Sequence, residues 1–113
     1  MLKKILLLLS GLIITATAIG MNKAHAHPLC DNLYEYSFAV MMGKQYGLPI
    51  ERALEAIDRR NPPPVLRPYY ILIVRDAYTH QTQNTEEMKT AAINQYSAEW
   101  YFLCMEKSGV SYE

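Results

Sequence analysis

The hydrophobic positions after residue 30 recur at the spacing of amphipathic helices, and turn-forming residues divide them into four segments. The predicted buried face of the first segment, residues 31–46, contains Leu33, Tyr34, Phe38, Met41 and Met42. That of the second, residues 49–60, contains Ile50, Ala53, Leu54 and Ile57. That of the longest, residues 85–107, contains Ile93, Tyr96, Trp100, Leu103 and Cys104. These three segments are predicted to be helices that pack through one face.

Residue types at the segment boundaries support these helices. Asp31 suits the N-cap of the first helix, and Gly47 is typical of the position just past a helix C-terminus. Pro49 suits the first position of the second helix. Asn84, followed three residues later by Glu87, predicts a capping box at the start of the last helix.

The remaining segment, residues 68–80, is apolar on every side over residues 69–74. Its aromatic and β-branched composition also suits a buried strand, but a lone strand has no partner within the chain. We therefore predict a central buried helix, preceded by a stiff spacer at Pro62, Pro63 and Pro64. The alternative is a short strand that pairs edge to edge with a second copy.

The two cysteines lie near the two ends of the helical region. Cys30 precedes the first helix and Cys104 lies near the end of the last. A disulfide between them would make these helices antiparallel neighbours and would contribute on the order of 4 kcal/mol to stability. The prediction is a small all-α, four-helix up-down bundle closed by one disulfide. The alternative is two thiols that pack separately as small apolar groups.

Residues 1–26 have the three parts of a secretory signal peptide: Lys3 and Lys4, an apolar stretch over residues 5–19, and the cleavage signal Ala24-His25-Ala26. The apolar stretch has fifteen residues, fewer than the roughly 20 that span a bilayer. We predict cleavage, a single helical domain over residues 27–113, a periplasmic or secreted location and no stable membrane anchor. An uncleaved anchor is the alternative.

Cleavage changes the charge of the chain. Eight basic and eleven acidic residues remain, which gives a formal charge of −3. The only local concentration of basic residues is Arg59, Arg60 and Arg67. Because nucleic-acid binding requires a clustered basic face, no nucleic-acid partner is expected.

Few residues suggest metal or catalytic chemistry. Only His27 and His80 remain after cleavage, and divalent metal sites need three or four preorganised ligands, so no metal or cofactor is predicted. A serine-nucleophile elbow is absent, and the sequence Lys107-Ser108-Gly109 lacks the companion motif of penicillin-recognising enzymes. Glu35 and Glu99 are the only candidates for acid/base hydrolysis, but a solvated helix face accounts for each of them. The chain is therefore predicted not to be an enzyme.

Tyrosine is abundant, with all nine residues in the mature region. Tyrosine is enriched where proteins bind one another, and Tyr36, Tyr78 and Tyr101 are the candidate binding surface. The alternative is that the rings complete a small core while the hydroxyl groups reach water.

The order of features resembles a loose group of small uncharacterised exported helical proteins of Gram-negative bacteria and their phages. The resemblance lies in the signal peptide, the early cysteine, residues 44–47 (Lys-Gln-Tyr-Gly), residues 85–89 (Thr-Glu-Glu-Met-Lys) and the Tyr101-x-x-Cys104 ending. These motifs are structural, so the resemblance implies an exported helical domain and no catalytic residue.

The leading hypothesis is an exported, non-enzymatic helical module that binds a protein or envelope component, of inhibitor or immunity type. One alternative is a small periplasmic hydrolase that acts on glycan or peptide. The other is a structural accessory protein that self-associates through residues 69–74. The oligomeric state and the partner are left open by the sequence.

Overall fold

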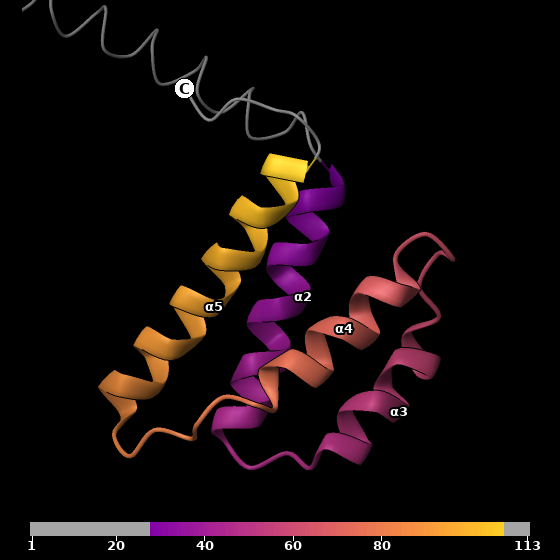
Figure 1. The fold of residues 1–113 in the computed structure, drawn as a ribbon. Coiled ribbons are helices and arrows are strands. Elements are labelled where there is room, and N and C mark those ends of the chain that lie inside the picture. Colours follow the sequence, from indigo (N-terminus) through magenta and orange to yellow (C-terminus); the bar gives the residue numbers. More distant parts are fainter. Residues whose placement is uncertain (1–27, 108–113) are drawn as a thin grey trace, which may run out of the picture.

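Four α-helices make up residues 28–107, the part of the chain that the computed structural model describes (Figure 1). They are α2 (Pro28–Gln45), α3 (Ile50–Arg60), α4 (Arg67–Ala77) and α5 (Glu86–Lys107). Residues 28–107 contain no strand, so residues 69–74 are helical as predicted. The predicted signal peptide, His27 and residues 108–113 lie outside the described residues.

Helix α2 is the centre of the bundle. Helix α5 packs along it, α4 packs against another part of its surface, and α3 covers α4 (Figure 1). Successive helices reverse direction, which confirms the all-α up-down bundle. The prediction that residues 69–74 form the central helix is wrong. Helix α2 lies at the centre because it contacts all three other helices. One side of α4 therefore faces solvent.

The disulfide joins the first turn of α2 to the last turn of α5. Cys30 and Cys104 are bonded, their Cα atoms lie 5.5 Å apart, and they are separated by 74 positions in the sequence. The predicted pairing is confirmed. It fixes the start of α2 beside the end of α5, as expected for antiparallel neighbours.

Helix α2 ends in a Schellman motif. Gly47 has a φ angle of +91°, a conformation that strains any residue with a side chain. The amide of Leu48 donates to the carbonyl of Gly43 at 2.9 Å, and the amide of Gly47 donates to the carbonyl of Lys44 at 3.3 Å. The prediction that α2 stops at Gly47 is therefore confirmed in its hydrogen bonds.

Predicted helix starts are displaced by one to three residues. Helix α2 begins at Pro28, so Asp31 lies in its first turn and is not its N-cap. The Thr85 hydroxyl oxygen accepts a hydrogen bond from the Met88 amide at 3.1 Å, so Thr85 and not Asn84 caps α5. Helix α5 begins at Glu86, which makes Thr85 the residue just before the helix. Pro49 is likewise the extended N-cap of α3 and not its first helical residue.

The core is formed by residues of all four helices and by Leu66, which lies just before α4. Its buried members are Leu33, Tyr36, Val40, Met41, Ala53, Ile57, Leu66, Tyr70, Ile73, Val74, Ala77, Ile93, Tyr96 and Trp100. Tyr34, Met42 and Leu103 were predicted to be buried but are exposed. The buried arc of α2 instead includes Tyr36, because α4 and α5 contact α2 on different sides.

A buried amide fixes the connection between α4 and α5. The Gln45 side chain donates to the carbonyl of Gln81 at 3.0 Å and accepts from the amide of Gln83 at 2.8 Å. The Lys89 ammonium donates to the carbonyls of Gln45 and Gln83, both at 2.8 Å. The last turn of α2 therefore holds the loop that sets where α5 begins.

Candidate binding groove

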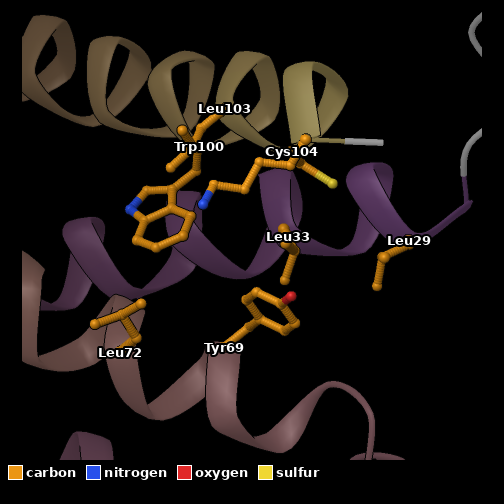
Figure 2. A pocket seen from close by; sticks show the side chains of 8 residues that line it. Leu29, Leu33, Tyr69, Leu72, Trp100, Leu103 and Cys104 are labelled. Carbon is orange, nitrogen blue, oxygen red and sulfur yellow. The ribbon is translucent and has the colours of Figure 1, made fainter. Parts of the chain in front are cut away.

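An apolar groove lies between α4 and α5, with α2 forming its floor (Figure 2). One hollow has a volume of about 250 Å³ and is lined by Leu29, Leu33, Tyr69, Leu72, Trp100, Leu103, Cys104 and Lys107. A second hollow of about 330 Å³ is lined by Leu72, Trp100, Leu103, Asp76 and Glu99. Because the two share three residues, they form one continuous surface, here called the α4–α5 groove.

The groove exists because α4 and α5 both pack on α2 and make few contacts with each other. Figure 2 shows side chains from all three helices facing the same space. The floor is buried, with Leu33 2% and Trp100 9% exposed. The rim is apolar yet open to water: Leu29, Tyr69, Leu72 and Leu103 are between 37% and 53% exposed. Contiguous apolar rims of this kind are typical of interaction sites.

The two ends of the groove carry opposite charges. Lys107 lies at one end with Leu29 and Tyr69, and Asp76 and Glu99 lie at the other. All three charged side chains are on exposed residues. Apolar side chains therefore line the groove along its length, while one end carries a positive charge and the other end carries negative charges.

The acidic end is built over a buried tyrosine. The Tyr96 hydroxyl donates to the carbonyl of Ile73 at 2.8 Å, which links α5 to α4. Burial raises the pKa of Tyr96 well above its ordinary value, and the negative charges of Asp76 and Glu99 raise it further. Asp76 and Glu99 both line the second hollow, so the two carboxylates lie at the same end of the groove.

Comparison with family models, curated proteins and solved structures finds no match to this chain. The candidate function therefore depends on the groove itself.

Tyr36, one of the three tyrosines predicted as a binding surface, is part of the core. Its ring is 4% exposed and stacks on the Tyr70 ring, with centroids 3.8 Å apart and planes 6° apart. The Arg60 guanidinium lies 5.4 Å from the centroid of the Tyr36 ring. Tyr36 therefore ties α2 to α4 and α3, and presents almost no surface to a partner.

The other two predicted tyrosines lie toward opposite ends of α2. The Tyr78 hydroxyl donates to the carbonyl of Leu48 at 2.6 Å, and the Lys44 ammonium lies 5.7 Å from its ring centroid. Tyr101 packs edge-on against Tyr34 at 6.0 Å. Ten residues of helix separate the α2 partners Lys44 and Tyr34, which corresponds to about 15 Å. The structure does not bring Tyr36, Tyr78 and Tyr101 together into one surface.

Burial of Tyr36 predicts a specific behaviour in alkali. Burial raises the pKa of Tyr36 from 10.0 to about 12, although the nearby Arg60 charge partly opposes the rise. The neutral phenol therefore stabilises the fold below about pH 10, and this contribution is lost as the pH rises through 12. We expect Tyr36→Phe to move alkaline unfolding to higher pH, as followed by far-ultraviolet circular dichroism. Tyr69→Phe, which changes an exposed ring, should leave the transition in place.

The residues proposed for other chemistry lie apart from one another. Glu35 and Glu99 are both exposed, so neither has the desolvated setting that a buried acid catalyst requires. His80 faces the Asp76 carboxylate at 3.8 Å and the edge of the Tyr96 ring at 5.1 Å. Within residues 28–107, no group of three or more His, Cys, Asp or Glu side chains is arranged to hold a metal ion. None of the helices described is both long and apolar enough to cross a membrane.

Proposed function

We propose that this chain is an exported, non-enzymatic binding module that takes a helical segment of a partner protein into the α4–α5 groove. The observation that carries the proposal is the pairing of a buried floor with an exposed apolar rim. An open apolar groove between helices is the usual receptor for the apolar face of an amphipathic helix.

The dimensions of the groove suit a short helical segment. Its lining on α5 extends from Glu99 to Lys107, a separation of eight positions, which corresponds to about 12 Å or just over two turns. Two turns present two or three apolar side chains on one face. Trp100 and Leu72 lie in the middle of the groove, where central aromatic and aliphatic anchors contribute most to affinity.

A location outside the cytoplasm would suit the same proposal. The Cys30–Cys104 disulfide and the absence of a membrane-spanning helix among the described residues are compatible with a location outside the cytoplasm. A periplasmic or secreted module of this kind would bind a protein of the envelope, as an inhibitor or immunity factor does. The exposed settings of Glu35 and Glu99 favour this proposal over a hydrolase.

Site-specific cross-linking in cells tests the proposal. We expect a photoreactive residue at Leu72 to cross-link to an envelope protein, and Leu103→Glu to abolish that product because it places a charge on the apolar rim. Met88 is the matched control position, since it is exposed on α5 but lies outside the groove. Equal cross-linking at positions 72 and 88, or a product that survives Leu103→Glu, would contradict the proposal.

A further inference from the structure

We propose that the α4–α5 groove also accepts α4 of a second copy of this chain, which gives a two-fold dimer centred on Leu72. This inference rests on the proposed role of the groove as a helix-binding site. It names α4 of a second copy as one occupant of the groove and gives the direction in which that helix lies.

Helix α4 has the surface that such a groove requires. Leu72 is 53% exposed in the middle of α4, Tyr69 lies one turn before it, and Arg75 lies one turn after it. Leu72 and Tyr69 also line the groove of their own chain. One helix therefore forms both a wall of the groove and an apolar ridge beside it, so that two copies can each insert Leu72 into the groove of the other.

The charges of the groove favour the antiparallel direction that a two-fold axis imposes. A two-fold axis through Leu72 reverses the groove of the second copy, so each acidic end faces a basic end. Asp76 and Glu99 of one copy then lie toward Lys107 of the other, and the reverse pair forms symmetrically. A parallel arrangement would instead place like charges together.

Residue spacing along α4 agrees with this pairing. In antiparallel helices that cross at Leu72, a residue three positions after the crossing faces a residue three positions before it. Arg75 is therefore placed over the Tyr69 ring of the second copy, an arrangement that suits a cation–π contact. Since the pairing uses one groove and one helix face per copy, its area is near the small end of specific interfaces, and we expect a micromolar dissociation constant.

Molecular mass in solution tests the dimer. Sedimentation velocity of the oxidised protein, from well below to well above the expected dissociation constant (about 0.05 to 500 μM), should show the weight-average mass rising from that of one chain to that of two. Leu72→Glu should weaken the dimer at least about 100-fold, because a carboxylate would replace the central apolar contact. Met88→Glu should leave the dissociation constant unchanged. A monomer at every concentration, or a dimer insensitive to Leu72→Glu, would overturn the proposal.

A charge exchange tests the two-fold direction independently of the apolar contact. Asp76→Lys and Lys107→Glu should each weaken the dimer about tenfold, and the double variant should recover most of that loss. Both changes are at exposed positions, so circular dichroism should show an unchanged fold in all three variants. A double variant as weak as the product of the two single changes would rule out this pairing.

The two proposals can fail separately. A protein that stays monomeric while position 72 cross-links to an envelope protein retains the proposed function and loses the dimer. A dimer broken by Leu72→Glu, without any envelope product at position 72, retains the dimer and loses the proposed function. If both hold, a partner helix and the second copy compete for one groove, and the envelope product should decrease as the chain is overproduced.

Discussion

Replacement of both Cys30 and Cys104 by serine is expected to lower the free energy of unfolding by about 4 kcal/mol. The bond closes a loop with a sequence separation of 74, so its loss restores a large amount of conformational freedom to the unfolded chain. Small domains are typically stable by about 5–15 kcal/mol, so the loss removes much of the total. Urea denaturation of the oxidised protein and the double variant measures the difference.

The double replacement avoids the free thiol that a single replacement would leave. Oxidised protein treated with a thiol reductant is a second route to the same state, and its denaturation midpoint should match that of the double variant. A difference in unfolding free energy below about 1 kcal/mol would show that the packing of α2 against α5 holds the ends together without the bond.

Gln45→Met is expected to lower the free energy of unfolding by about 2 kcal/mol. Methionine has a similar length and fills the same space, so the change removes hydrogen bonds with little loss of volume. The Gln83 amide loses its side-chain partner beside a residue that is 1% exposed, and the Gln81 carbonyl keeps only the longer hydrogen bond from the Gln83 side chain at 3.5 Å. An unsatisfied buried group costs about 1–3 kcal/mol, and partial access of water to this loop reduces the sum.

Amide hydrogen exchange locates the effect of Gln45→Met. The Gln83 amide should exchange faster in the variant, whereas amides in the middle of α2 should change only with global stability. Gln95→Ala is the matched control, because its side chain donates only to the exposed Glu99 carboxylate and its loss should cost less than about 0.5 kcal/mol. Equal effects at positions 45 and 95 would contradict the role assigned to the buried amide.

The number of helices and the disulfide that joins two of them follow from local signals in the sequence. Ile50, Ala53 and Ile57 recur on one face of α3, and Gly47 marks the end of α2 because few other residues adopt its backbone conformation. The disulfide follows from the positions of the two cysteines and from the predicted export of the chain. The start of α5 was misplaced by one residue because Asn84 and Thr85 are both good caps, and only the observed hydrogen bond selects Thr85.

The position of each helix within the bundle does not follow from such signals. A segment that is apolar on every side, as residues 69–74 of α4 are, normally lies at the centre, yet α2 takes that place. The arc buried on α2 includes Tyr36 and excludes Tyr34 because two neighbouring helices approach it from different directions. A hydrophobic pattern predicts one buried face for each helix, so it does not predict burial of α2 from two directions.

The groove was missed for a related reason. Leu72 and Leu103 are ordinary core-type residues in the sequence, and their exposure depends on how far apart α4 and α5 lie on α2. The excess of tyrosine drew the prediction to Tyr36, Tyr78 and Tyr101, which the structure places in three separate settings. Their shared property is that each ring packs against other side chains.

The sulfur-to-sulfur connection also has a consequence for the timing of synthesis. A polypeptide that emerges N-terminus first, from a ribosome or a translocation channel, exposes Cys30 long before Cys104. The early thiol must therefore wait, reduced or temporarily joined to an oxidant, until almost the whole chain has appeared. The disulfide that closes this bundle can therefore form only after nearly all of the chain has emerged.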